Sequence, residues 1–240
     1  HGSTEKHLSS DDPNKSMVVS YGKGSAQTVA EQNKQCLTCH GTMDKLLNWE
    51  ISKHKKNDVS CASCHKMHPG EKGLSLHDKP GVVKKVSMKP SIETCFECHK
   101  DIKADLNKFS HHPVNEGKVA CWDCHNPHGE PTKAMIKAET INQLCYKCHG
   151  EKRGPYAFDH PPVVEDCAAC HQVHGSKHVK LLSEPPPFLC QSCHYGSVAI
   201  PYGGNTKIGG SHPSSYFFGR QCLNCHERIH GSNISKEYFR

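Results

Sequence analysis

The stretch CFECHKDIKADLNKFSHHPVNEGKVACWDCHNPH, residues 95–128, determines how this chain folds. It holds two C-x-x-C-H motifs, with a His-Pro pair between them and a further histidine three residues after the second motif. A similar arrangement occurs four times in the 240 residues, although no proline follows His54 and His230 stands four residues past its motif. C-x-x-C-H is the attachment signal for haem c, because two thiols bind one edge of a porphyrin and the next residue places an imidazole at the iron. We therefore interpret the rest of the chain as a scaffold for haem.

The 16 cysteines form eight C-x-x-C pairs, each followed directly by histidine, and we number these motifs 1 to 8 in chain order. Disulfide bonds and zinc sites also use paired cysteines, but neither explains a histidine after every pair. We therefore predict eight covalently attached haems c. The attachment residues are Cys36, Cys39, Cys61, Cys64, Cys95, Cys98, Cys121, Cys124, Cys145, Cys148, Cys167, Cys170, Cys190, Cys193, Cys222 and Cys225. The first iron ligands are His40, His65, His99, His125, His149, His171, His194 and His226.

A second axial ligand is predicted for every iron. The chain has 21 histidines, and eight of those outside the motifs recur at equivalent positions. Four lie between the two motifs of a repeat, at His54, His112, His160 and His212, and four lie just past the second motif, at His68, His128, His174 and His230. The five methionines do not recur with the repeats, so we predict bis-histidine, low-spin iron throughout. His111 is the one alternative, since it directly precedes His112.

The spacing leaves open which histidine serves which haem. If the two haems of each repeat exchange ligands with each other, all eight irons receive a second axial ligand from this chain. If each repeat serves the next, one haem at one end needs His1, His7 or a histidine from a second subunit.

Four dihaem modules organise the sequence, with an irregular period that is typical of repeat proteins. The predicted segments are an N-terminal arm (1–35), module 1 (36–75), a linker (76–92), module 2 (93–130), module 3 (139–178), module 4 (188–230) and a C-terminal tail (231–240).

The composition predicts a fold that depends on its cofactors. Only 35% of the residues are hydrophobic and 7% aromatic, and the mean hydropathy is −0.69. Such a chain has too few apolar side chains for an ordinary core, so the porphyrins must supply apolar volume. We expect mostly irregular coil with short α-helices and little or no β-structure, arranged as an elongated repeat array around a haem chain. Apolar spacing predicts short helices near residues 43–51 and 93–109, the second with Ile102, Leu106 and Phe109 on one face.

The formal charge of +6 does not indicate nucleic-acid binding. Each oxidised bis-histidine haem contributes about −1, so eight would bring the protein to about −2 and the basic residues would offset the propionates. The sequence has no apolar run long enough to span a bilayer. Because haem c is attached outside the cytoplasm, we expect an exported chain whose signal peptide has been removed.

The pattern CxxCH…HPV…CxxCHxPHG in residues 95–129 resembles the doubled C-x-x-C-H multihaem cytochromes. These include periplasmic carriers of porin–cytochrome conduits in metal-reducing bacteria and pentahaem donors to nitrite reductase. The resemblance covers about residues 36–230, although the best-known conduit members carry ten haems. It implies electron flow from a periplasmic or inner-membrane donor to an outer-surface cytochrome, with the haem chain partly threaded through an outer-membrane β-barrel.

Closed coordination favours electron transfer over catalysis, since no iron position is left for a substrate. The alternative is a self-assembling extracellular filament built from copies of this chain. A multihaem reductase with one open haem is less favoured, because the count of histidines closes every site. The expected location is the periplasm or outer membrane, or outside the cell if the protein is filamentous.

Overall fold

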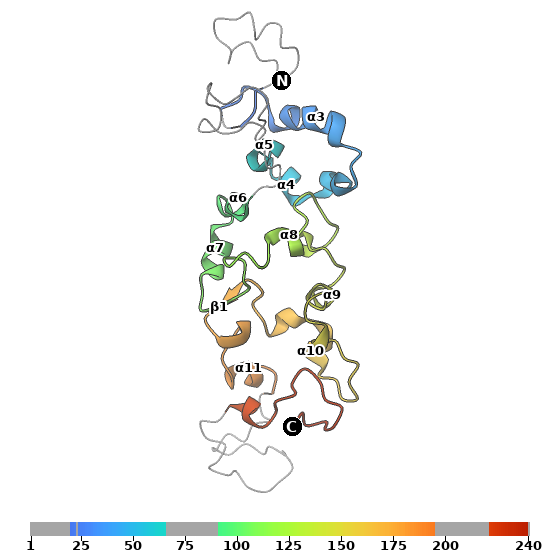
Figure 1. Cartoon of the computed structure of the whole chain (residues 1–240), viewed down its shortest axis with the longest axis vertical. Coiled ribbons are helices and arrows are strands. Elements are labelled where there is room, and N and C mark those ends of the chain that lie inside the picture. The colour runs from blue at the N-terminus through green and yellow to red at the C-terminus, as the bar shows by residue number, and fades with distance from the viewer. Residues whose placement is uncertain (1–19, 23, 66–90, 195–220, 240) are drawn as a thin grey trace, which may run out of the picture. The chain divides into compact units, whose positions relative to one another are not determined.

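A computed structural model describes residues 20–22, 24–65, 91–194 and 221–239. Short helical turns joined by irregular segments make up most of this part of the chain (Figure 1). Its only sheet has two strands of two residues each. The predicted fold class of short helices and coil with little β-structure is therefore confirmed. No helix in the described segments is long and apolar enough to cross a membrane.

Two compact units divide the chain. The first consists of His1–Lys100 together with Ala120–Lys137, and the second consists of Asp101–Val119 together with Ala138–Arg240. Each unit contains four of the eight motifs. The segment between motifs 3 and 4 thus belongs to the second unit, while both of those motifs belong to the first.

The elements of the first unit are mostly single helical turns. They are α3 (Val29–His40), η1 (Asp44–Leu46), η2 (Trp49–Ile51), α4 (Lys53–Lys56), α5 (Cys61–Cys64), α6 (Ile92–Phe96), α8 (Cys121–Cys124) and η3 (Lys133–Met135). The start of α3 is fixed by a capping box, in which the Thr28 backbone N–H donates to Glu31 and the Glu31 backbone N–H donates to the Thr28 hydroxyl. Motif 1 forms the last turn of this helix.

The second unit has the same character. Its elements are α7 (Lys100–Leu106), β1 (Ser110–His111), α9 (Ile141–Cys145), η4 (Gly150–Lys152), α10 (Pro161–Glu165), η5 (Cys167–Ala169), β2 (Gly175–Ser176), η6 (Val179–Leu181), α11 (Phe188–Gln191) and η8 (Cys222–Asn224).

The two helices predicted from apolar spacing are shorter and more broken than expected. Residues 43–51 form the two separate 3₁₀ turns η1 and η2. Residues 93–109 divide into α6 and α7, because the N–H groups of Cys98 and His99 both turn back to the Cys95 carbonyl. Leu106 is fully buried, whereas Phe109 lies beyond the end of α7 and is 78% exposed, so the helix does not reach the third residue of the expected face.

The polypeptide buries few apolar side chains of its own. Within the described ranges they are Trp49, Phe96, Leu106, Val114, Met135 and Leu182. Six side chains make only a small core, so close contacts between backbone segments carry much of the packing. The expected shortage of apolar core material is therefore visible in the structure.

Glycine allows one of these backbone contacts at the small sheet. Strands β1 and β2 are antiparallel, and His111 is the partner of Gly175. A Cβ atom built on Gly175 would lie 1.8 Å from the Asp105 carbonyl oxygen, far inside contact distance. Any side chain at position 175 must therefore push the end of α7 away from β2.

We predict that Gly175→Ala lowers the stability of the folded protein by about 1–3 kcal/mol, the usual cost of overpacking. Gly150→Ala is the matched control, because a Cβ on Gly150 would meet nothing within 4 Å. Thermal unfolding followed by circular dichroism measures both variants. Equal melting temperatures for the two would contradict the close approach at β2.

Candidate haem-binding site

Every C-x-x-C-H motif forms one tight turn. Outside α3, the histidine backbone N–H donates to the carbonyl of the first cysteine at 2.8–3.1 Å in each of motifs 2 to 8. Motif 1 is helical through His40 as part of α3. A single turn thus carries two thiols and an imidazole, which is the donor set that haem c requires. None of the 16 cysteines is buried, and none is joined to another by a disulfide bond.

Imidazole rings face one another in pairs. Five motif histidines each lie opposite a histidine from a different module, with ring centroids 5.9–6.4 Å apart. The pairs are His65 with His128, His99 with His54, His149 with His112, His194 with His160, and His171 with His230. In all five, the second member is one of the recurring histidines found in the sequence.

The spacing of these pairs fits a metal ion between the rings. Two metal–nitrogen bonds of about 2 Å each, plus roughly 1 Å from each ring centre to its nitrogen, separate the centroids by about 6 Å. Aromatic rings in direct contact cover the same range of centroid distances, about 4.5–7 Å, so this spacing permits a metal ion without requiring one. The centroid distances are therefore compatible with a metal ion bound by both rings of a pair.

Backbone carbonyls orient the histidines that lie between motifs. Nδ1 of His54 is 2.8 Å from the Pro127 carbonyl oxygen, and Nδ1 of His112 hydrogen-bonds the Val173 carbonyl oxygen. The Ile229 carbonyl lies in the corresponding place beside His160, without the geometry of a full hydrogen bond. A carbonyl only accepts, so Nδ1 of His54 and of His112 carries the proton. Nε2 is then the nitrogen left for a metal.

The carbonyls beside these histidines come from equivalent positions in successive modules. Pro127, Val173 and Ile229 each come directly before a recurring histidine, namely His128, His174 and His230. The segment past the second motif therefore supplies both a histidine and a carbonyl that positions another histidine.

The second motif of a module uses a similar device. Nδ1 of His125 donates to the Ala134 carbonyl at 2.8 Å, and Nδ1 of His171 donates to the Lys180 carbonyl at 2.8 Å. Nδ1 of His226 donates to the Glu237 carbonyl.

A residue with left-handed backbone lies at, or directly after, each of the three accepting carbonyls. Ala134, Lys180 and Tyr238 have φ values of 57°, 57° and 59°, which are uncommon for residues other than glycine. Each of these loops has a strained backbone conformation at this point, and a carbonyl is thereby turned toward the imidazole. Sequence reasoning missed these residues, because a backbone acceptor leaves no mark in the side-chain pattern.

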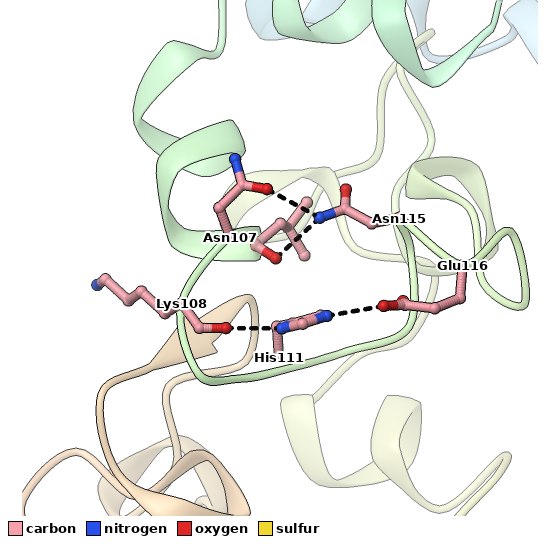
Figure 2. A network of polar contacts seen from close by, with 6 residues as sticks. Asn107, Lys108, His111, Asn115 and Glu116 are labelled. Atoms are coloured by element: carbon pink, nitrogen blue, oxygen red, sulfur yellow. Dashed lines mark hydrogen bonds and ion pairs between the residues drawn. The ribbon is translucent and has the colours of Figure 1, made fainter.

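His111 has both ring nitrogens occupied by other partners. Nδ1 lies 2.7 Å from the Lys108 carbonyl oxygen, and Nε2 lies 3.0 Å from a Glu116 carboxylate oxygen. Dashed lines mark both contacts in Figure 2. The hydrogen bond to Glu116, and then the one to Lys108, raises the pKa of His111. His112, in contrast, faces His149 at 6.4 Å. The geometry thus favours His112 over the neighbouring histidine as the ligand.

Burial keeps several of the facing imidazoles neutral. It lowers the pKa of His128 first by desolvation and then through the nearby His65. Burial also lowers the pKa values of His160 and His230. Neutral imidazole is the form that binds a metal ion.

The first cysteines of the two motifs in each module lie close together. Burial, and then the adjacent Cys36, raises the pKa of Cys61 to about 11. The same causes act in the other three modules, where the paired thiols are Cys95 with Cys121, Cys145 with Cys167, and Cys190 with Cys222. These pKa shifts show only that the thiols are neighbours. Once a thiol is attached to haem it is a thioether, which has no proton to lose.

Second cysteines lie near one another across module boundaries. Burial raises the pKa of Cys64, and Cys98 of the next module adds to the effect. Burial likewise raises the pKa of Cys170, with a contribution from Cys193. Motifs 1, 2, 3 and 4 therefore form one continuous series in the first unit. Motifs 5, 6, 7 and 8 form another in the second unit.

A buried asparagine joins the two motifs of modules 1 and 3. Asn33 Oδ1 accepts from the Cys61 backbone N–H at 2.8 Å. Asn142 Oδ1 accepts from the Cys167 backbone N–H at 2.7 Å, and its Nδ2 donates to the carbonyls of Val163 and Val164 at 2.8 and 2.9 Å. Both asparagines stand three residues before the first cysteine of their module, a signal that sequence reasoning overlooked. Modules 2 and 4 have isoleucine and proline at this position.

The remaining predicted ligands are only partly placed. His68 and His212 lie outside the described residues. His174 is half-buried, and its carbonyl accepts from the His112 backbone N–H at 3.3 Å. His40 and His226 are described in their motifs, and the His226 ring stacks on Phe239 with centroids 4.9 Å apart.

This arrangement of motif turns and facing imidazoles defines a c-type cytochrome that holds several haems covalently. Residues 111–154 and 160–198 match the family described as "Doubled CXXCH motif", and residues 1–87 match "Cytochrome c-type protein NrfB-like". The chain belongs to the multihaem c-type cytochromes with doubled C-x-x-C-H motifs.

Three relatives show how far the similarity reaches. The chain is 40% identical over 219 residues to "Multiheme cytochrome MtrA" of Shewanella baltica, covering 90% of this chain and 62% of that one. It is 34% identical over 162 residues to "Cytochrome c-type protein NrfB" of Haemophilus influenzae, covering 60% and 68%. It is 26% identical to "High-molecular-weight cytochrome c" of Nitratidesulfovibrio vulgaris, of which it spans 35%. The chain thus spans less than two thirds of the first and third of these relatives.

We predict that Asn142→Ala destabilises the protein by about 2–4 kcal/mol, because the buried Cys167 N–H loses its acceptor and two carbonyls lose a donor. Gln143→Ala, at the exposed neighbouring position, is the control and should change little. Denaturant unfolding of the purified holoprotein measures both. A difference of less than about 1 kcal/mol between the variants would show that the asparagine does not hold module 3 together.

Proposed function

We propose that this protein is an octahaem cytochrome that conducts electrons along closely spaced haems, each ligated by two histidines. The facing imidazole pairs carry the proposal, because they provide both ligands for the haems of motifs 2, 3, 5, 6 and 7. His68, His174 and His212 complete the ligand count for the other three. With both axial positions filled, iron changes charge without changing ligands, and no coordination site is left for a substrate.

Ligand exchange between neighbouring modules links the haems. A histidine between two motifs serves the first haem of the following module, as His54 does for motif 3 and His160 does for motif 7. A histidine past the second motif serves the second haem of the preceding module, as His128 does for motif 2 and His230 does for motif 6. This scheme replaces the exchange inside each module that the sequence left open. The haems of motifs 2 to 7 would then each tie two modules together, while the haems of motifs 1 and 8 would take His68 and His212 from their own modules.

The order of electron transfer follows the cysteine contacts. Thiols of successive motifs lie against or near one another throughout motifs 1 to 4 and again throughout motifs 5 to 8. Porphyrin edges attached at these thiols would be close neighbours, with little polypeptide between them. A short edge-to-edge path favours a wire over a set of isolated centres.

The physiological role follows from the attachment chemistry and the resemblance. Haem c is attached outside the cytoplasm, so the protein is exported. We propose that it carries electrons across the periplasm and outer membrane, from a periplasmic or inner-membrane donor to an outer-surface cytochrome. An outer-membrane porin is the proposed structural partner. The resemblance of the doubled C-x-x-C-H pattern to conduit cytochromes supports this choice, and the 40% identity to "Multiheme cytochrome MtrA" supports a multihaem cytochrome.

Replacing His112 tests the ligand scheme. We predict that His112→Ala leaves the haem of motif 5 with only His149, so that a high-spin ferric signal appears in the optical and electron paramagnetic resonance spectra. His111→Ala is the matched control and should stay low-spin, since both nitrogens of that ring bond other groups. The reverse outcome would assign the ligand to His111.

Mass and size test the function as a whole. We predict that the purified protein carries the mass of eight haems, that cyanide and nitrite leave its oxidised spectrum unchanged, and that it runs as a discrete particle alone or with a porin. Regular fibres in electron micrographs and elution in the void volume would favour the extracellular filament instead. A spectrum that shifts with nitrite would indicate an open haem and a reductase.

A further inference from the structure

The indole of Trp49 is buried beside the proposed haem of motif 2. Trp49 begins η2 and is only 6% exposed. Its ring lies edge-on to His128, with centroids 6.5 Å apart and planes at 65°. His128 in turn faces His65 of motif 2 at 5.9 Å, with planes 16° apart. The indole is therefore packed against an imidazole that we assign to iron.

The N–H group of this indole has no acceptor among the described residues. Trp49 Nε1 is buried and makes no hydrogen bond with any of them. Buried N–H groups of tryptophan nearly always have a partner, because desolvating a donor without one is costly. The acceptor for this donor must come from a group other than the described polypeptide.

Backbone packing holds the indole in place. A Cβ on Gly129 would lie 2.2 Å from the Asn48 carbonyl oxygen and 3.0 Å from the Ser52 side chain. The loop that carries Trp49 is thus pressed against the residue that follows His128. Such a fixed position makes the direction of the N–H group a constant feature of the site.

The equivalent contact in the second unit has no N–H donor. There the Asp105 carbonyl approaches Gly175, the residue after His174, as the Asn48 carbonyl approaches Gly129. The residue after Asp105 is Leu106, which is 1% exposed. Leucine fills this position by packing alone, so packing does not require tryptophan. The distinguishing property of Trp49 is its N–H group.

We propose that Trp49 Nε1–H donates a hydrogen bond to a propionate of the haem attached at Cys61 and Cys64. Carboxylates are the strong hydrogen-bond acceptors that haem c offers, and a bond from N–H to a carboxylate is charge-assisted. The inference rests on the proposed haem of motif 2 and identifies Trp49 as a positioning residue for it. By drawing negative charge away from the propionate, the bond stabilises the reduced iron.

Trp49→Phe in the holoprotein tests the bond, because phenylalanine keeps an aromatic ring and removes the donor. Ultraviolet resonance Raman difference spectra between the parent protein and the variant isolate the indole N–H band of Trp49 from that of Trp122. We expect this band to report a strong hydrogen bond. The propionate bending modes of one haem should shift in the variant, and the midpoint potential of that haem should become more negative. Leu106→Met, a swap of similar volume, is the matched control and should move neither signal.

A free indole N–H in the parent protein would overturn the proposal. So would unchanged propionate modes and potentials in Trp49→Phe. Intact mass and the low-spin spectrum are recorded on the same samples. If the haem of motif 2 is absent or high-spin in the parent protein, the proposed function fails. If that haem is present and bis-ligated but the variant is silent, only the role of Trp49 fails.

Discussion

The interaction on which this structure depends is the facing of two imidazole rings about 6 Å apart, a spacing that a metal ion bound by both rings would require. Five such pairs lie in the described part of the chain, and each joins residues far apart in sequence. A polypeptide with six buried apolar side chains in that part gains little from an ordinary core. Iron–imidazole bonds between modules can supply the long-range contacts that apolar packing supplies elsewhere.

Backbone carbonyls orient many of these histidine rings by accepting hydrogen bonds from them. They receive Nδ1–H from histidines between motifs, such as His54, and from histidines within motifs, such as His125 and His171. Each bond fixes the tautomer of a ring, so Nε2 is the nitrogen left for a metal. Two of these carbonyls belong to Ala134 and Lys180, whose left-handed backbone conformation costs free energy. The strained residues are thus the ones whose carbonyls orient the histidines of the motifs.

The proposed exchange of ligands between modules would also explain why the modules are irregular. A segment past the second motif supplies a histidine to one neighbour, a carbonyl to another histidine, and a glycine where a preceding loop comes close, as at Gly129 and Gly175. The lengths between these points can vary as long as the contacts themselves are kept. Modules 1 and 3 add a buried asparagine that modules 2 and 4 lack, so the modules share a ligand scheme without sharing every support.

The sequence by itself determined the cofactor chemistry, because C-x-x-C-H needs only five adjacent residues to place two thiols and an imidazole on one turn. It also indicated which other histidines recur and that helices would be short. Only the tertiary structure decided that His54 faces His99 and that His112, not His111, faces His149. It alone showed the carbonyl of Ala134, the amide of Asn142 and the buried indole of Trp49. These depend on backbone acceptors and long-range proximity, which residue type and local spacing do not encode.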